Sequence, residues 1–143
     1  MPFYTIHTGS NIMLVPCEIA VKCVLPAVRA MTAKRLIEKH GLNQAQAAQL
    51  LGLSQPAISL YSRRMRGKAL NVREDEEITD MVNALASSLV EGHLTHKEFI
   101  PRFCEICRTI RTKGLLCQMH KAFDPSIKIE ECELCRTTNS LRC

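Results

Sequence analysis

Aromatic side chains are scarce in this sequence: Phe, Trp and Tyr make up 4% of its 143 residues, and Trp is absent. A stacking platform for single-stranded nucleic acid needs several exposed aromatic rings, so the chain has too few residues to build one. No apolar run approaches the ~20 residues that a membrane-spanning helix requires. The N-terminus also lacks the basic start and long apolar core of a secretory signal. These absences predict a cytoplasmic protein that does not cross a membrane.

The net charge of +5 is distributed unevenly along the chain. Residues 22–73 hold ten Lys or Arg and one acid, residues 74–91 hold six acids and no base, and residues 92–143 hold nine bases and six acids. A basic segment followed by an acidic one suggests a surface that faces a polyanion and a neighbouring surface kept away from it. A basic surface that is merely solvated is the alternative explanation.

The hydrophobic pattern predicts a mainly α-helical protein, a helical bundle with a small cysteine-rich subdomain, and divides the chain into four parts. Residues 1–12 form an arm, and Met13 is an alternative start. Residues 13–73 form a helical domain in which Pro26 separates a short helix, over about residues 17–24, from a longer one whose first turn it can occupy. Residues 74–91 form an amphipathic helix with acidic residues in its first turn. Residues 92–143 form the cysteine-rich subdomain, in which Thr95 begins a short helix that ends near Phe99.

The sequence of residues 43–66 predicts two short helices that cross one another and are joined by a three-residue turn. Asn43 and Ser54 are suited to cap the two helix starts, and Gly52 can adopt the positive φ that the turn needs. Ala48 is small enough for the second helix to pack across it. The remaining inter-helix core positions are apolar, as this packing requires: Ala47, Leu51, Leu53, Ile58 and Tyr61. A helical hairpin with no role in DNA binding is the alternative.

The segment LNQAQAAQLLGLSQPAISLYSRRMRG resembles the helix-turn-helix of the phage-repressor class, also called the XRE type, over about residues 28–67. From Met13 onward, and including the later motifs CEIC and GLLCQMH, the chain is also similar to archaeal regulators that join such a domain to a cysteine-rich tail. The resemblance implies a transcriptional regulator, not an enzyme. It also implies binding to a double-stranded DNA operator by a homodimer that reads two half-sites.

In a protein of this class the second helix would enter the major groove. Gln55 opens that helix and Gln44 opens the preceding one, and the resemblance implies that one glutamine brackets a phosphate while the other reads adenine. A capping role is the alternative for Gln55. Basic residues that follow the second helix are expected to contact phosphates, which contributes affinity rather than sequence choice. The predicted DNA-binding residues are Gln44, Ser54, Gln55, Ala57, Ser59, Ser62, Arg63, Arg64, Arg66 and Lys68.

The chain has eight cysteines, which in a cytoplasmic protein rarely form a disulfide framework. Cys17 and Cys23 lie in an apolar stretch and are expected to be buried, and the terminal Cys143 receives no role. The other five are Cys104, Cys107, Cys117, Cys132 and Cys135, which include two Cys-x-x-Cys pairs. Such pairs on tight turns build four-thiolate metal sites. The two outer pairs are the first choice as ligands, and Cys117 is a fifth candidate that could replace one of them.

Two metal centres fit this pattern. Zinc is the commoner centre, and Cys104, Cys107, Cys117 and His120 alone would complete a site of three thiolates and one imidazole. A [4Fe–4S] cluster is slightly favoured, because a regulator needs an input and a redox- or oxygen-labile cluster would supply one. Nearby cations that could offset the charge of such a cluster are Arg102, Arg108, Arg111 and Lys113. His120 is a ligand in the zinc case and a packing residue in the cluster case.

Two features bear on assembly and on alternative functions. One apolar stripe on the 74–90 helix is a candidate dimer interface, although packing against the chain's own core is equally compatible with it: Ile78, Met81, Val82, Leu85 and Leu89. The motif GLLCQMH after a Cys-x-x-Cys pair is also similar to treble-clef zinc modules of some endonucleases. No paired acids or Asp/Glu–His arrangement that could activate water is present, so a nuclease is a remote alternative. The third possibility is an architectural or antitoxin-like protein that binds DNA constitutively and holds a structural zinc ion.

Overall fold

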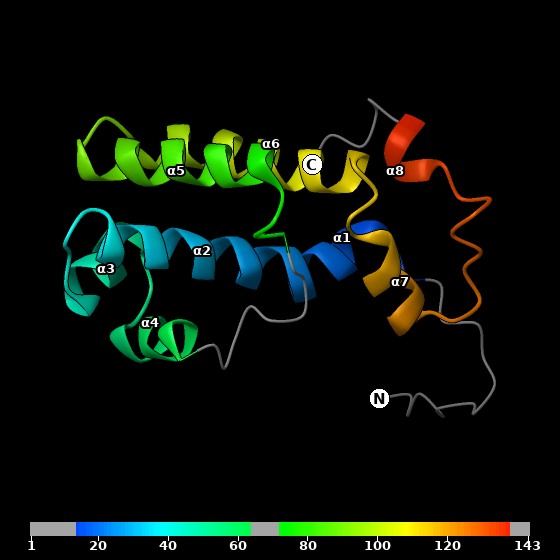
Figure 1. The fold of residues 1–143 in the computed structure, drawn as a ribbon, viewed down its shortest axis with the longest axis horizontal. Coiled ribbons are helices and arrows are strands. Elements are labelled where there is room, and N and C mark those ends of the chain that lie inside the picture. The colour runs from blue at the N-terminus through cyan, green and yellow to red at the C-terminus, as the bar shows by residue number, and fades with distance from the viewer. Residues whose placement is uncertain (1–13, 64–71, 138–143) are drawn as a thin grey trace, which may run out of the picture.

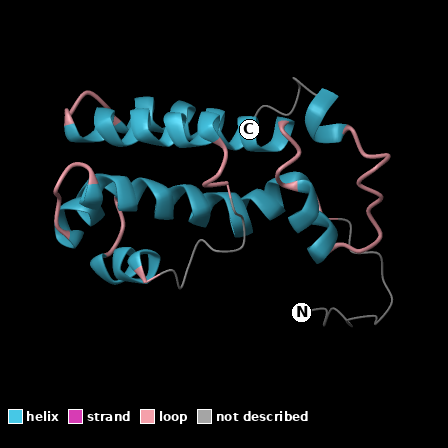
Figure 2. Cartoon of the chain, in the orientation of Figure 1, coloured by secondary structure: helices cyan, strands magenta, loops and turns pink. Residues whose placement is uncertain are grey.

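The computed structural model describes residues 14–63 and 72–137, and this part of the chain contains helices and no strand. The expected mainly α-helical fold is therefore confirmed at this level (Figure 2). None of the described helices combines the length and apolar character that crossing a bilayer demands. In chain order the helices are α1 (Pro16–Ile19), η1 (Ala20–Val24), α2 (Leu25–Glu38), α3 (Gln44–Leu51), α4 (Gln55–Ser62), α5 (Glu76–Val90), α6 (His96–Thr112), α7 (Cys117–Phe123) and α8 (Leu134–Thr137).

The segments α1, η1 and α2 follow one another without a break and form the central rod of the molecule (Figure 1). The expected short helical stretch before Pro26 and longer helix with Pro26 in its first turn are confirmed, although the two stretches follow one another without a gap. Pro26 lies in the first turn of α2, and the turn before it is π-helical, with the Leu25 N–H bonded to the Ala20 carbonyl five residues earlier. A wider turn accommodates a proline that has no N–H to donate, so the helix continues past it.

Helices α5 and α6 lie side by side and cover one side of the rod (Figure 1). Along α5, the buried side chains Ile78, Val82, Leu85 and Leu89 belong to the same hydrophobic cluster as Val24 and other residues of η1 and α2. The stripe predicted as a dimer interface is therefore used inside the chain, with only Met81 partly exposed. Intramolecular packing was the equally compatible alternative, and it is the one found.

Helix α6 is much longer than the sequence analysis predicted. It starts after Thr95, whose backbone N–H and hydroxyl both bond to the Glu98 carboxylate, but it runs through Pro101 to Thr112. Apolar residues at helical spacing hold it in place: Ile106 and Ile110 are fully buried in the cluster that contains the α5 stripe. This packing outweighs the one backbone hydrogen bond that Pro101 removes. Helix α6 thus shares a core with α2 and α5, although the sequence analysis assigned it to a separate subdomain.

Helices α3 and α4 pack on the opposite side of α2, near its C-terminal end (Figure 1). Their buried side chains form a second hydrophobic cluster with residues of α2: Ala30, Ala33, Leu36, Ala47, Ala48, Ile58 and Tyr61, joined by Ala86 of α5. The half-buried Leu51 packs against both clusters, and no other half-buried hydrophobic residue within 14–63 and 72–137 does so. Leu51 therefore contacts both the cluster around α3 and α4 and the cluster formed by η1, α2, α5 and α6.

Candidate functional site

The α3–α4 pair forms with the local geometry that its sequence predicts. The Asn43 side chain accepts a hydrogen bond from the Gln46 backbone N–H (2.8 Å), and the Gln46 side chain accepts one from the Asn43 N–H (2.9 Å). Gly52 ends α3 with φ 63° and ψ 33°, the left-handed conformation that favours glycine. The Ser54 hydroxyl then accepts a hydrogen bond from the Ala57 N–H (3.3 Å) and caps α4. Both caps and the turn match the predictions.

Helix α4 has a buried side and an exposed side. Ile58 and Tyr61 are buried against α2 and α3, whereas Ser54, Gln55, Ser62 and Arg63 are exposed. Among the remaining predicted DNA-binding residues, Gln44, Ala57 and Ser59 are half-buried. Arg64, Arg66 and Lys68 lie outside the described residues. The Ser62 hydroxyl donates a hydrogen bond to the Ile58 carbonyl (3.0 Å), so its proton is engaged within its own helix.

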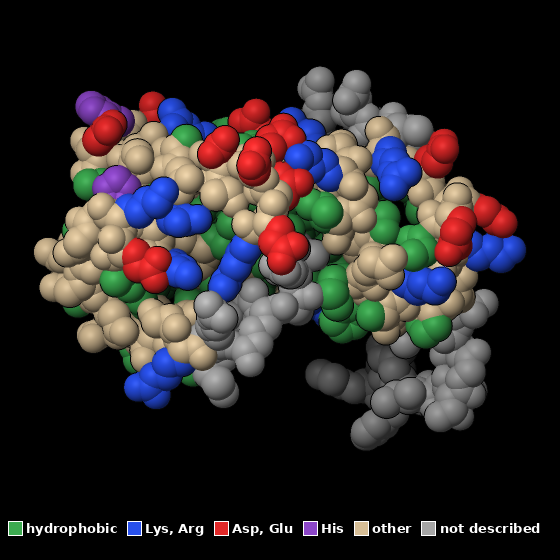
Figure 3. All heavy atoms as spheres, in the orientation of Figure 1, with side chains coloured by type: hydrophobic (Ala, Val, Ile, Leu, Met, Phe, Trp, Pro, Cys, Tyr) green, Lys and Arg blue, Asp and Glu red, His purple; other side chains and the backbone are tan. Residues whose placement is uncertain are grey.

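Acidic and basic side chains differ in where they are most numerous on the face shown in Figure 3, although each kind also occurs among the other. Acidic side chains gather along α5, while Lys and Arg side chains lie over α2 and at α4 below it. Few of the basic side chains on α2 are neutralised: Lys34 pairs with Glu38 at 3.8 Å, and this exposed pair contributes little. Positive charge near the exposed side of α4 is the electrostatic arrangement that a polyanionic ligand requires.

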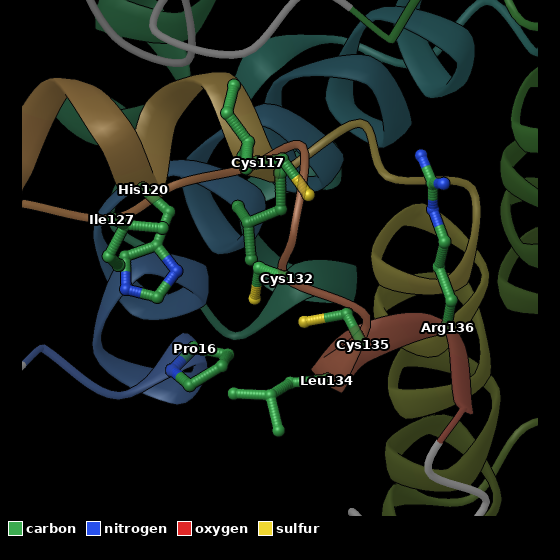
Figure 4. Close-up of a pocket in the computed structure, with 10 residues that line it drawn as sticks. Pro16, Cys117, His120, Ile127, Cys132, Leu134, Cys135 and Arg136 are labelled. Carbon is green, nitrogen blue, oxygen red and sulfur yellow. The ribbon is translucent and has the colours of Figure 1, made fainter.

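Three of the five tail cysteines meet in one place, where α7 lies near α8 and the loop that leads into it. Cys117 begins α7, Cys135 lies in α8, and Cys132 precedes that helix by two residues. All three line a cavity of about 20 Å³ together with His120 and Arg136. Figure 4 shows the Cys132 and Cys135 sulfur atoms directed toward one another. As placed, no three Cys, His or acidic side chains of residues 14–63 and 72–137 converge closely enough to hold a metal ion.

Burial disfavours the thiolate form of Cys117. The pKa of the Cys117 thiol is raised, first by burial and then by the nearby Cys135 and Cys132 thiols, and Arg136 opposes the rise only in part. A thiol with a raised pKa stays protonated at neutral pH, whereas a metal ligand must lose its proton. A bound cation is what would hold these clustered sulfurs in the thiolate form.

Arg111 is a buried cation beside this cluster. It exposes 4% of its surface, and its Nε atom has no hydrogen-bond partner among the described residues. Burial disfavours its charge, but the Cys135 sulfur within hydrogen-bonding reach, and the neighbouring Cys17 and Cys107, outweigh burial and raise its pKa. The ion pairs formed by the described residues do not include Arg111. A buried guanidinium without a carboxylate needs another anion, and the neighbouring cysteine sulfurs are candidates for it if they lose their protons.

The remaining cysteines divide between two places. Cys107 lies in α6 on the side of Arg111, one turn before it. Cys104 lines a different hollow, a groove between α2, α3 and α6. Cys104 and Cys107 are both inside a long helix, so the first Cys-x-x-Cys pair does not form the tight turn that the sequence analysis expected. Cys23 is buried as expected, but the expectation for Cys17 is wrong because that residue is exposed.

Only one of the four cations predicted to surround the metal lies among the thiols. Lys113 instead pairs with Asp75 (2.9 Å) and Glu77 (2.7 Å) at the start of α5. Arg102 donates a hydrogen bond to the Ser88 hydroxyl (2.8 Å), and Arg108 is exposed. Arg136, which the sequence analysis did not select, lines the thiol cavity. Its position next to the second Cys-x-x-Cys pair was the available signal.

His120 is buried at the edge of the cavity and fastens the start of the described chain to α7. Its Nε2 lies 2.7 Å from the Leu14 carbonyl, which can only accept, so Nε2 carries the proton. Only Nδ1 is then left as a possible metal ligand, and a second ring nitrogen bonded to a backbone carbonyl is the usual arrangement of a ligating histidine. Asp124 is buried next to it, and hydrogen bonds from Ser126 lower the pKa of that carboxyl.

Comparison of the chain with protein-family models, with curated proteins and with solved structures gave no match.

Proposed function

We propose that this protein is a sequence-specific DNA-binding transcriptional regulator of the helix-turn-helix type. The observation that carries the proposal is the α3–α4 pair, whose second helix buries Ile58 and Tyr61 while it exposes Gln55 and Arg63. An exposed helix with an amide near its start can reach base edges in the major groove. Net positive charge on residues 22–73 supports binding to the phosphate backbone.

The proposed recognition has two separable parts. Gln55 supplies sequence choice through its two-pronged amide, and Arg63 at the end of α4 supplies affinity through phosphate contact. The Ser54 side chain is already occupied as the cap of α4, so its role is to hold the helix start that presents Gln55. Dimeric binding to two half-sites stays part of the proposal, but the interface lies elsewhere than the α5 stripe, which is buried within the chain.

Operator sequences selected from a random duplex pool, followed by fluorescence anisotropy titrations, would test this proposal. Gln55→Ala should reduce discrimination among operators by about 1–3 kcal/mol while nonspecific affinity stays nearly unchanged. Arg63→Ala should weaken binding to every duplex and reduce its salt dependence. Gln49→Ala, an exposed glutamine of α3, is the matched control. If wild type and all three variants bound every duplex equally, α4 would not be the recognition helix.

We further propose that the cysteine tail holds a single zinc-like ion. The chain offers as ligands the thiols of Cys117, Cys132 and Cys135, with Cys107 or the Nδ1 of His120 as the fourth. Support comes from a cavity of about 20 Å³, which holds about one water-sized occupant, and from the buried Arg111 that lacks a carboxylate. A four-iron, four-sulfide cluster is much larger than this cavity, so the donor set fits it less well. A bound zinc ion would cross-link α7 to the loop before α8 and supply no redox chemistry.

Anaerobic purification with metal analysis and a visible spectrum separates these two centres. A colourless protein with one zinc per chain is the expected result. Brown protein that absorbs broadly near ~400 nm and bleaches in air would replace the proposal with an iron–sulfur sensor. Protein that binds neither metal after reconstitution under reducing conditions would refute a metal-binding tail.

A further inference from the structure

A groove of about 590 Å³ lies between α2, the end of α3, the α5–α6 connection and the first half of α6. This volume falls within the range of small-molecule sites, which is roughly 300–1,000 Å³. Figure 1 shows α3 and the α5–α6 connection at the same end of α2. The groove shares none of the residues that line the thiol cavity.

The residues that line the groove are mostly apolar, and none of them is acidic. The apolar ones include Leu25, Leu94, Phe99 and Phe103. The polar ones include Arg29 and His96. Arg29 is half-buried, and within the described residues it takes part in no ion pair. A cation in an apolar groove without acids favours a ligand that has an anionic head and an apolar body.

We propose that this groove binds a small amphipathic carboxylate, with Arg29 holding the carboxylate and the aromatic and aliphatic walls holding the apolar body. Arg29 extends from α2, so its charge is positioned by the central rod rather than by a mobile loop. Planar guanidinium groups match carboxylates with two parallel hydrogen bonds, which makes Arg29 the orienting residue of the site.

The position of the groove connects it to the α3–α4 pair. Leu50, Leu51 and Gly52, the last turn of α3 and its cap, form one of its walls. Leu51 packs against both hydrophobic clusters, so a ligand that displaces it also alters how α3 and α4 sit on α2. Bound carboxylate would therefore change DNA affinity, a consequence that rests on the proposed DNA-binding function. Ligand binding itself does not depend on that function.

Isothermal titration calorimetry of the full chain with octanoate, below its micelle concentration and without DNA, tests the site. We expect one octanoate per chain and weak or no binding of octylammonium. Arg29→Met should weaken octanoate binding by roughly 10- to 100-fold, because a charge-assisted contact is lost. Arg35→Met, a half-buried arginine of the same helix that does not line the groove, is the matched control.

A second variant keeps the proposal falsifiable if Arg29→Met folds poorly. Ile100 lines the groove yet is 49% exposed, so Ile100→Glu should fold, repel octanoate and improve binding of octylammonium. Val21→Glu, at another exposed apolar residue away from the groove, should change neither. Equal binding of both amphiphiles, or octanoate binding unaffected by Arg29→Met and Ile100→Glu, would overturn the proposal. So would a dimer that Ile100→Glu dissociates, because a second copy would then occupy the groove.

Titrations with operator DNA distinguish failure of the groove proposal from failure of the DNA-binding proposal. If the protein binds an operator, octanoate should shift operator affinity in wild type and not in Arg29→Met. If the protein binds octanoate but no duplex, the groove assignment holds and the helix-turn-helix proposal fails. If operator binding is present but octanoate does not bind, the DNA-binding proposal holds and the groove assignment fails.

Discussion

Replacement of Arg111 by Met should have opposite effects on the metal-free and the metal-bound protein. Arg111 is 4% exposed, and its Nε atom has no hydrogen-bond partner among the described residues. A buried charge without an anion is unfavourable, and Met keeps part of the apolar stem without the charge. We therefore expect metal-free Arg111→Met to be as stable as wild type or up to about 4 kcal/mol more stable, as found when buried charges are replaced by apolar residues.

In the metal-bound protein, Arg111→Met should be unfavourable instead of neutral or favourable. Thiolate ligands bring negative charge beside Arg111, and the guanidinium then stabilises the centre as a neighbour of Cys135 and Cys107. Loss of such a partner of the ligands lowers metal affinity by about 10- to 100-fold, or roughly 1.4–2.7 kcal/mol. Zinc competition against a chromophoric chelator measures this loss, and urea unfolding with EDTA and reductant measures the metal-free stability. Arg108→Met, an exposed arginine one turn earlier in α6, should change neither quantity.

One outcome would refute the reasoning about Arg111. If Arg111→Met destabilised the metal-free protein by several kcal/mol and left zinc affinity unchanged, Arg111 would be a packing residue. The thiols beside it would then not form an anionic centre, and the zinc proposal would lose its electrostatic support.

Three further predictions follow from the packing. Cys135→Ser should abolish stoichiometric zinc, measured by atomic absorption, while Cys104→Ser should retain it; the reverse would restore the outer pairs as ligands. Hydrogen bonding to Lys113 lowers the pKa of Asp75, so this pair stabilises the fold at neutral pH, and the contribution is lost as the pH falls below about 4. Lys113→Met should accordingly lower the free energy of unfolding at pH 7 and make it depend less on pH. Urea unfolding curves that are identical for Lys113→Met and wild type at pH 7 and at pH 3 would contradict this. Ile58→Ala should destabilise the protein by about 2–5 kcal/mol in thermal unfolding, because it opens a cavity where α4 meets α2, and an unchanged melting temperature would mean that α4 is not part of the cooperative core.

The sequence determined the elements whose structure depends on near neighbours. The capping residues Asn43 and Ser54 and the turn residue Gly52 act through hydrogen bonds and φ values within a few positions, so α3 and α4 were predictable. The same holds for α5, whose start is set by Asp75, with its carboxylate accepting from the Ile78 N–H. Amphipathic spacing also identified Ile58 and Tyr61 as core residues, because helical periodicity requires no knowledge of the partner surface.

Only the tertiary structure decided which surface each apolar stripe and each cysteine would meet. The α5 stripe could have packed on a second copy or on α2, and periodicity cannot distinguish these partners. Pro101 reads as a helix break because the local rule counts the missing N–H, whereas packing of α6 into the core compensates for it. Likewise, spacing along the chain could not show that Cys117 joins Cys132 and Cys135 while Cys104 faces another groove, because that grouping depends on how α6, α7 and α8 pack in space.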